Sequence, residues 1–143
     1  MLILSGIRPW GRRMRDSLLI HCSNAEAREV RSRATFQRRT VSGYVVNIVL
    51  RRVDFAEEIS AGGPATFKLR PDLRAKIARP RTTLHIYCAR DEANRIRGAA
   101  RRGKLTISSF VRHCLRSSWE IEDSLSALQR KNIQRLQNRL KMD

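Results

Sequence analysis

The chain has 143 residues and a formal net charge of +17, from 30 lysine and arginine residues against 13 acidic ones. This length fits one compact domain or two very small ones, and a charge beyond what solubility requires predicts an anionic partner: nucleic acid, an anionic membrane or an acidic protein. Three cysteines without C-x-x-C spacing argue against a disulfide framework and against structural zinc, and no run approaches the roughly 20 apolar residues of a membrane span.

Residues 1–14 form the first predicted segment, a basic N-terminal arm. The apolar run at its start is short and is followed, not preceded, by cationic residues, so it is a poor signal peptide. The stretch IRPWGRRMR contains a proline and a glycine and is not expected to be ordered alone. Two interpretations are open: the arm follows the phosphates of a nucleic acid, or it is a leader without a function of its own.

The next segment occurs twice in the chain. Residues 15–51 align without a gap with residues 81–117, and eleven of the 37 aligned positions are identical. Chance would give roughly two or three identities, so we interpret the pattern as an internal repeat. We therefore expect two similar units, 15–53 and 81–119, joined by a linker at 54–80.

Each unit is predicted to open with a short strand, at 17–22 (SLLIHC) and at 83–88 (TLHIYC). Polar and apolar residues alternate in both segments, which places every second side chain on one face. The faces expected in the core carry Leu18, Ile20, Cys22, Leu84, Ile86 and Cys88.

A charged helix is predicted to follow each strand. It begins near Asn24 in the first unit and near Arg90 in the second, because Glu26 and Glu92 would lie in the first turn, where acidic side chains are favourable. Gly103 is the predicted end of the second copy. The narrow apolar stripe of these helices consists of Ala27, Val30, Ala34, Ala93, Ile96 and Ala100.

A second helix in each unit is predicted to supply most of the core. Thr40 and Thr106 are suitable N-caps. The apolar residues that follow have the i, i+3, i+4, i+7, i+8 spacing of a helix with one buried face. They are Val41, Tyr44, Val45, Ile48 and Val49, and Ile107, Phe110, Val111, Cys114 and Leu115.

A lone strand of six residues leaves its backbone hydrogen-bonding groups unpaired, so each strand needs a partner. The predicted fold class is mainly α with a short two-stranded antiparallel β-ribbon, in which the two units pair around a pseudo-two-fold axis above four helices. A flexible linker of the length of 54–80 spans on the order of 30 Å, which permits pairing within one chain. Pairing between two molecules is the alternative.

The last segment, 120–143, is predicted to be a helix of about 20 residues after the second unit. Packing of its apolar residues against the core and binding of another protein are both open, and self-association through this helix would make neighbouring sites fill cooperatively. The apolar positions are Ile121, Leu125, Leu128, Ile133, Leu136 and Leu140.

Strand, helix, turn and helix within about 40 residues, with the motif T-[VI]-S-x-[YF]-V at the start of the last helix, resemble the ribbon-helix-helix fold of the Arc, MetJ and CopG DNA-binding proteins. The resemblance covers both units, 15–53 and 81–119. Two such units in one chain resemble the arrangement of TraY-type conjugation accessory proteins and of some regulators. The resemblance implies that a β-ribbon enters the major groove of duplex DNA.

The side chains opposite the core face of the ribbon would then contact base edges. Serine, threonine, histidine and tyrosine can form hydrogen bonds with bases, and leucine can contact a thymine methyl group. The alternative is that these are ordinary solvent-facing residues. The six predicted positions are Ser17, Leu19, His21, Thr83, His85 and Tyr87.

The resemblance also implies phosphate contacts at the N-terminus of the last helix of each unit, where N–H groups and the positive dipole end favour anions. The residues of these turns are Thr40, Ser42, Gly43, Thr106, Ser108 and Ser109, and the cationic residues before them are Arg38, Arg39, Arg101, Arg102 and Lys104. Capping alone, or a solvated run of charge, is the competing interpretation.

The two strands differ at equivalent positions: Leu19 corresponds to His85, and His21 to Tyr87. If the strands pair within one chain, the ribbon has two different ends, and we expect a recognition element that is not palindromic.

The expected function is sequence-specific binding of double-stranded DNA, as a transcriptional regulator or a plasmid-mobilisation accessory factor in a bacterial cytoplasm, associated with the nucleoid or a plasmid. The alternatives are an RNA-binding or ribonucleoprotein component, and a scaffold that recruits a partner through residues 120–142. The sequence contains no paired carboxylates, nucleophile elbow or phosphate-binding glycine loop, so it does not predict an enzyme. No cofactor or metal is expected. The three cysteines are interpreted as small buried hydrophobic residues.

Overall fold

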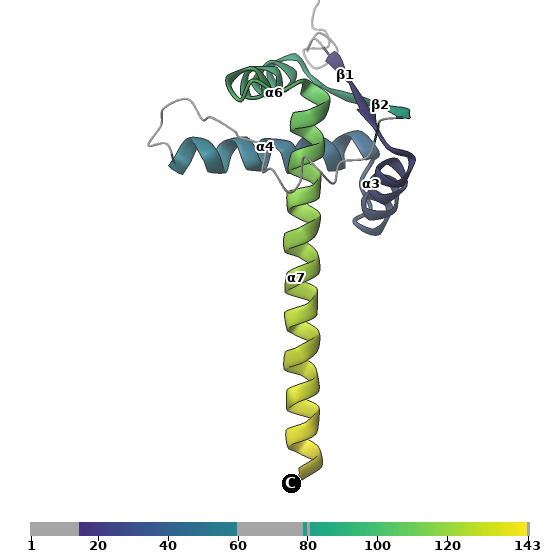
Figure 1. The fold of residues 1–143 in the computed structure, drawn as a ribbon, viewed down its shortest axis with the longest axis vertical. Coiled ribbons are helices and arrows are strands. Elements are labelled where there is room, and N and C mark those ends of the chain that lie inside the picture. The colour runs from purple at the N-terminus through teal and green to yellow at the C-terminus, as the bar shows by residue number, and fades with distance from the viewer. Residues whose placement is uncertain (1–14, 60–78, 80, 143) are drawn as a thin grey trace, which may run out of the picture.

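The computed structural model describes residues 15–59, 79 and 81–142. The predicted basic arm at 1–14 and most of the predicted linker lie outside the described residues. The element order is β1 (Arg15–Cys22), α3 (Asn24–Phe36), α4 (Val41–Ile59), β2 (Thr82–Ala89), α6 (Arg90–Arg102) and α7 (Ile107–Met142). The prediction of a mainly helical chain with one two-stranded antiparallel sheet is confirmed (Figure 1).

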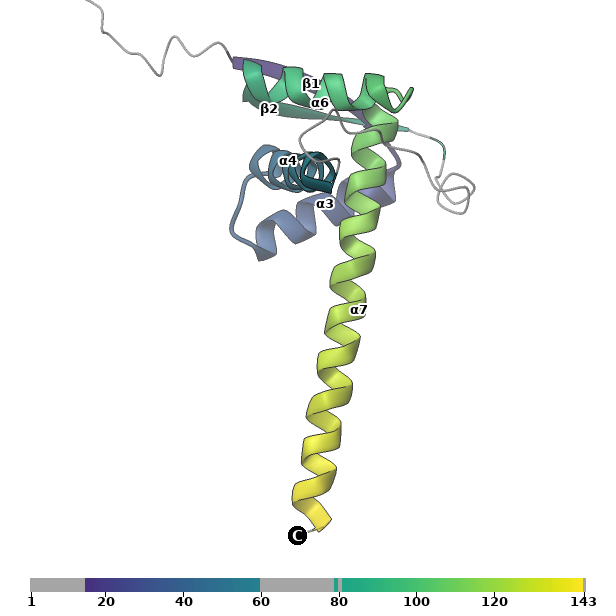
Figure 2. The same ribbon diagram turned by 90° about the vertical axis from the view of Figure 1, so that its left-hand side faces the viewer.

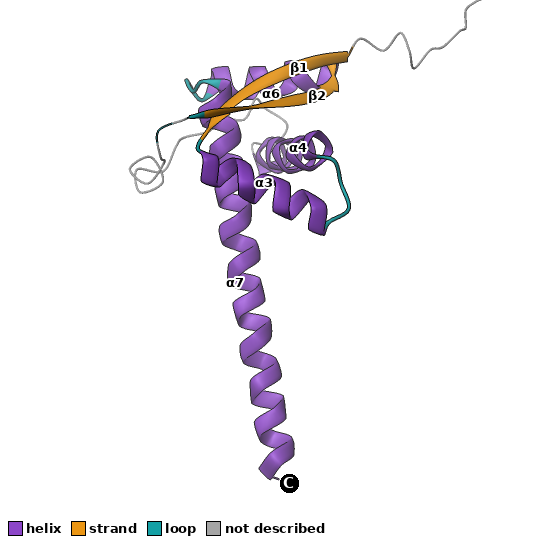
Figure 3. Cartoon of the chain, turned by 90° about the vertical axis from the view of Figure 1, so that its right-hand side faces the viewer, coloured by secondary structure: helices purple, strands orange, loops and turns teal. Residues whose placement is uncertain are grey.

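The two strands pair along their whole length. Arg15 lies opposite Ala89 at one end of the ribbon, and Cys22 lies opposite Thr82 at the other. Both strands alternate between exposed and buried side chains, as their sequences predict. The buried face lies against the helices, and Figure 3 shows the ribbon crossing one end of the helical layer.

Helices α3 and α6 begin with equivalent carboxylates in the first turn. The N-cap of α3 is Ser23, whose hydroxyl accepts a hydrogen bond from the Glu26 N–H at 3.1 Å, while a Glu26 carboxylate oxygen accepts one from the Ser23 N–H at 2.9 Å. Serine and glutamate three residues apart form a capping box, which satisfies two donors that the helix leaves unpaired. In α6 the N-cap position is occupied by Ala89, and only the Glu92 half of the box is made, at 2.9 Å to the Ala89 N–H.

Both first helices end in the same left-handed turn. Gly103 follows the last residue of α6, as predicted, but its φ of −84° is ordinary. The left-handed residue is the next one, Lys104, with φ 56°, and the equivalent Arg38 after α3 has the same φ. Residues with a Cβ rarely adopt this conformation. Here an arginine and a lysine adopt it, so neither turn has a glycine at its left-handed position.

Helices α4 and α7 begin at the predicted threonine caps. The Thr40 hydroxyl accepts a hydrogen bond from the Gly43 N–H at 3.0 Å, and the Thr106 hydroxyl accepts one from the Ser109 N–H at 3.1 Å. Helix α4 continues to Ile59, six residues into the predicted linker. Helix α7 is continuous for 36 residues, so no break separates the second unit from the predicted C-terminal helix (Figure 2).

The core is formed where both units meet under the ribbon. It contains the predicted apolar faces of both strands and of all four helices, and among its largest fully buried side chains are Tyr44, Phe110, Ile20 and Ile86. The first part of α7, up to Trp119, contributes to this core, whereas the large apolar residues beyond it are exposed. Among the described residues, no helix combines the length and apolarity that crossing a membrane would require.

Candidate functional site

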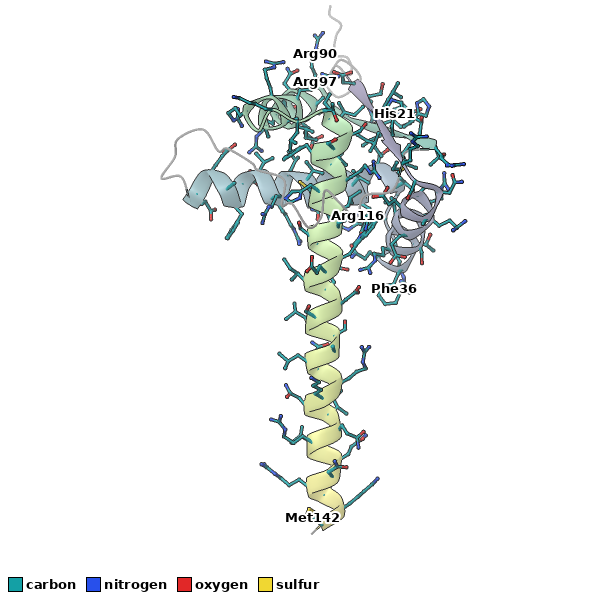
Figure 4. All side chains as sticks on the ribbon, viewed as in Figure 1. His21, Phe36, Arg90, Arg97, Arg116 and Met142 are labelled. Carbon is teal, nitrogen blue, oxygen red and sulfur yellow. The ribbon has the colours of Figure 1, made fainter. Side chains whose placement is uncertain are left out.

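The six predicted base-contacting residues lie together on the exposed face of the ribbon. All six are exposed, in alternation with the buried residues of their strands. Leu19 and Tyr87 are 49% and 59% exposed, which is unusual for large apolar and aromatic side chains in a short sheet. The face therefore offers hydroxyl, imidazole, phenol and methyl groups on one surface. Figure 4 labels His21 on this part of the molecule.

The register places the equivalent residues of the two strands relative to a central pair. Leu19 lies opposite His85, and these two residues are also equivalent in the sequence repeat. His21 lies opposite Thr83, and Ser17 lies opposite Tyr87. The equivalent residues His21 and Tyr87 are thus at opposite ends of the ribbon, and the two ends carry different chemistry.

One end of the exposed face is internally bonded. His21 Nδ1 lies 3.0 Å from the Thr83 hydroxyl, which fixes the ring relative to the neighbouring strand; which of the two donates depends on the imidazole tautomer. The ring's other nitrogen, Nε2, remains as the group that could meet a ligand. This cross-strand pair was not foreseen from the sequence, because the register was unknown.

Ser42 and Ser108 connect the helix N-termini to the outer edges of the ribbon. The Ser42 hydroxyl accepts a hydrogen bond from the Tyr87 N–H at 2.9 Å, and the Ser108 hydroxyl accepts one from the His21 N–H at 2.9 Å. The sequence left capping and phosphate contact open for these residues, and the structure shows a further contact, to the strand of the other unit. Each serine ties the second helix of one unit to the strand of the other, so one helix N-terminus is held at each edge of the exposed face.

The remaining residues of the two turns serve mainly as caps. Thr40 and Thr106 each hold a backbone N–H, and the Thr106 hydroxyl also donates to the Ser109 hydroxyl at 2.9 Å. Gly43 is closely packed, because a Cβ there would lie 3.1 Å from the Thr40 hydroxyl oxygen. The first turn of a helix has further N–H groups without intrahelical partners, so an anion could still be bound beside these caps.

The predicted phosphate-contacting cations are exposed and precede the two helix N-termini. Arg38 and Arg39 follow α3, whereas Arg101 and Arg102 end α6 and Lys104 follows it. The left-handed turns at Arg38 and Lys104 place both groups of cations immediately before the caps. The structure therefore brings the three predicted features together: the exposed ribbon face, the two helix N-termini and the basic turns.

Asp16 is an acidic residue at one end of the ribbon that the sequence analysis did not single out. Its carboxylate accepts a hydrogen bond from the Arg97 guanidinium at 2.7 Å. The hydrogen bond from Arg97, followed by one from the Ser17 backbone, lowers the pKa of Asp16. Arg97 thus offsets a negative charge beside the exposed face; the equivalent residue of the other strand is Thr82.

The cysteines are buried, as predicted. Cys22, Cys88 and Cys114 are free thiols, and burial raises the pKa of each, that of Cys114 to about 12. Neutral buried thiols are poor nucleophiles and poor metal ligands. In the part of the chain that the structure describes, no group of three or more histidine, cysteine or acidic residues could hold a metal ion.

Comparisons of the chain with protein-family models, with curated proteins and with solved structures give no match.

Proposed function

We propose that the chain is a sequence-specific binder of double-stranded DNA that inserts its ribbon into the major groove. In this proposal residues 15–53 and 81–119 act as two ribbon-helix-helix units that pair within one chain. The major groove is about 12 Å wide and admits a two-stranded ribbon, and the side chains proposed to read the bases are those on the exposed face.

The observation that carries the proposal is the pair of serine contacts at the two edges of the ribbon. Ser42 and Ser108 fix one helix N-terminus at each edge. In duplex DNA a phosphate backbone runs along each side of the groove. A ribbon in the groove would therefore bring both N-termini toward phosphates, where N–H groups and the helix dipole favour an anion.

The charge distribution supports the same partner. A net charge of +17 greatly exceeds what a domain of this size needs for solubility. The exposed cations before α4 and α7 add to the positive potential beside both helix N-termini. The uncharged, hydrogen-bonding ribbon face between them suits base contacts better than phosphate contacts.

The proposed role is that of a factor bound at a defined DNA element, either in transcriptional regulation or in plasmid mobilisation. Because the ribbon ends differ, with His21 and Thr83 at one and Ser17 and Tyr87 at the other, the element is proposed to be non-palindromic. Leu19 and His85 would face its centre.

Selection of binding sites from random duplexes by the full chain tests this function. We expect enrichment of an asymmetric motif that is bound tightly in the presence of excess RNA, with an affinity that falls steeply as salt rises. Recovery of no motif, or displacement of the selected duplex by RNA, would contradict the proposal. A strict inverted repeat would instead indicate pairing between chains.

A further inference from the structure

The distal part of α7 presents an apolar stripe with no covering element among the described residues. Figures 1 and 2 both show this part of the helix projecting away from the strands and the other helices. Each of its six large aliphatic side chains is more than half exposed. These side chains are Ile121, Leu125, Leu128, Ile133, Leu136 and Leu140. Packing against the core, one of the two options left open by the sequence, therefore does not occur in this structure.

The stripe is continuous with a groove between α4 and α7. The groove has a volume of about 340 Å³, and Ile48, Phe55 and Ile121 line it. Phe55 and Ile121 are both more than half exposed. Ile121 belongs to both the groove and the stripe, and Leu125 follows one helical turn later on the same face. A helix lying along the stripe would therefore reach the groove with its end.

The groove and the stripe are both bordered by positive charge. Arg39, Arg51 and Arg52 line the groove, and the Nε of Arg52 is buried without a hydrogen-bond partner in the described structure. The one acidic residue among the described lining residues, Glu122, is already paired with Arg33. Residues 124–142 include no acidic residue and five cationic ones: Arg130, Lys131, Arg135, Arg139 and Lys141. An occupant of this surface gains most if it combines an apolar seam with carboxylates on either side.

A second copy of the chain fits this surface poorly. Two such helices side by side in parallel would bring five cations from each copy together, and like charges along a helical interface are unfavourable. The five-residue step from Leu128 to Ile133 also interrupts the heptad spacing that a symmetric coiled coil requires.

DNA on the ribbon does not reach the stripe either. Helix α7 begins at Ile107, beside Ser108, which is bonded to β1, and its 36 residues extend over about 54 Å. Figure 2 shows that it runs away from the ribbon toward the C-terminus. A duplex bound at the ribbon would thus leave the distal helix accessible.

We propose that the stripe on α7 from Ile121 to Leu140, together with the α4–α7 groove, docks an acidic amphipathic helix of a partner protein. The apolar seam of that helix would cover the six exposed aliphatic side chains, and its carboxylates would pair with the bordering cations. Carboxylates at its end would meet the arginines of the groove. The chain would thereby hold a second protein on the side opposite the ribbon.

The test measures binding of two synthetic helical peptides to the full chain by fluorescence anisotropy. Both peptides carry leucines at heptad a and d positions; glutamates flank them in one peptide and lysines in the other. We expect the acidic peptide to bind at least about tenfold more tightly, a difference of roughly 1.4 kcal/mol, and its affinity to fall with salt.

Two variants of equal charge locate the binding surface. Leu128→Glu with Leu136→Glu places carboxylates in the stripe, and Ala127→Glu with Gln134→Glu places them on the opposite face of α7. The first variant should lose binding of the acidic peptide by at least about tenfold and the second by less than about threefold. Helix content by circular dichroism checks that both variants keep α7.

Three outcomes would overturn the proposal: equal binding of both peptides, a dimer in sedimentation equilibrium that only the stripe variant dissociates, or displacement of the acidic peptide by phosphatidylglycerol vesicles. They correspond to a non-selective apolar surface, a second copy and a membrane as the occupant. Duplex affinity should be unchanged in the stripe variant, so failure of the docking proposal and failure of DNA binding are separate results.

Discussion

The two halves of the molecule repeat one order of strand and helices but differ in the contacts of the glutamate in the first turn of the first helix. In the first half Glu26 is buried and pairs with two arginines of α7: Arg112 Nη2 at 2.7 Å and Arg116 Nε at 2.9 Å. Figure 4 labels Arg116 on the upper part of α7. In the second half Glu92 is only partly buried, and the positions equivalent to the arginines are Val46 and Leu50.

The second half has a hollow beside the residues that replace the two arginines. Glu92, Val46 and Leu50 line a hollow of about 350 Å³ on that side of the molecule. Two neighbouring contacts also use side chains of the first unit that differ from those at the equivalent positions of the second unit. Trp119 donates a hydrogen bond to the Tyr44 hydroxyl at 2.9 Å, and the Arg33 guanidinium lies over the Trp119 ring, whereas Ala99 stands at the position equivalent to Arg33.

These polar contacts discriminate between ways of pairing the units. Each joins the first unit to α7 of the second. If two first units paired with each other, Glu26 would face Val46 and Leu50, and a buried carboxylate would lose both cations. An unpaired buried charge costs several kcal/mol, so the network disfavours pairing of like units.

Removing the buried carboxylate should have the largest effect on this comparison. Glu26→Gln removes the carboxylate that pairs with Arg112, which is 5% exposed, and we expect a loss of about 3–5 kcal/mol in the free energy of unfolding. Glu92→Gln is the matched control and should lose less than about 1 kcal/mol, because Glu92 is partly exposed. Urea unfolding measures both. Equal losses would show that the two halves do not differ in this respect.

The same carboxylate predicts a pH dependence. Burial acts to raise the pKa of Glu26, but hydrogen bonds from Arg112 and the Ser23 backbone and the charges of Arg112 and Arg116 outweigh it, so the pKa lies below the usual 4.5. A lowered folded pKa contributes stability that is present above the unfolded pKa and is lost as pH falls through the folded value. We expect wild type and Glu26→Gln to differ most near neutral pH and to converge only as pH falls below 4.5 through the lowered folded pKa, as measured by thermal unfolding.

Changing the exposed residues of one end of the ribbon at a time should separate the two ends of the DNA site. On the proposed function, Ser17→Ala with Tyr87→Ala should relax base preference at one end of the element, and His21→Ala with Thr83→Ala at the other. We expect about 1–3 kcal/mol of discrimination to be lost at each affected base pair. Repeated site selection with each variant measures this. Uniform weakening on all duplexes would argue against base contacts by the ribbon.

Making the first half more like the second tests the tyrosine contact. Tyr44→Phe introduces the residue type found at the equivalent position, Phe110, and leaves the buried Trp119 N–H without its acceptor. A buried donor without a partner costs roughly 1–2 kcal/mol, which should appear as a lower urea midpoint. Phe110→Leu would not serve as a control because it removes core volume, so Tyr87→Phe on the exposed ribbon is used instead and should change the midpoint little.

The smallest expected effect concerns the two left-handed turns, which the halves share. Arg38→Gly and Lys104→Gly should each raise the free energy of unfolding by up to about 1 kcal/mol, because glycine adopts a φ of 56° without steric strain. Gly103→Ala should be nearly neutral, since its φ is −84°. Thermal unfolding distinguishes the three. If Gly103→Ala changed the free energy of unfolding more than Lys104→Gly does, Lys104 would not be the strained position.

Much of the fold followed from local patterns. The alternation of polar and apolar residues predicted both strands to within two residues of their ends. The i, i+3, i+4 spacing of apolar residues and the threonine caps predicted the helices of both units. The division at residue 120 came from the end of the repeat; the absence of glycine and proline from 107–142 could have indicated one continuous helix. The roles of Ser42 and Ser108 could not be found in this way, because their acceptors and donors lie in the other unit.

The sequence by itself determined which residues are strand, helix and core, since periodicity and capping act between near neighbours. Only the tertiary structure decided which side chains meet across the units: Glu26 with Arg112 and Arg116, Tyr44 with Trp119, and Leu19 opposite His85. The physical reason is sequence separation. These partners are 66 to 90 residues apart, so no local propensity selects them, and they are chosen by the joint burial of both units in one core.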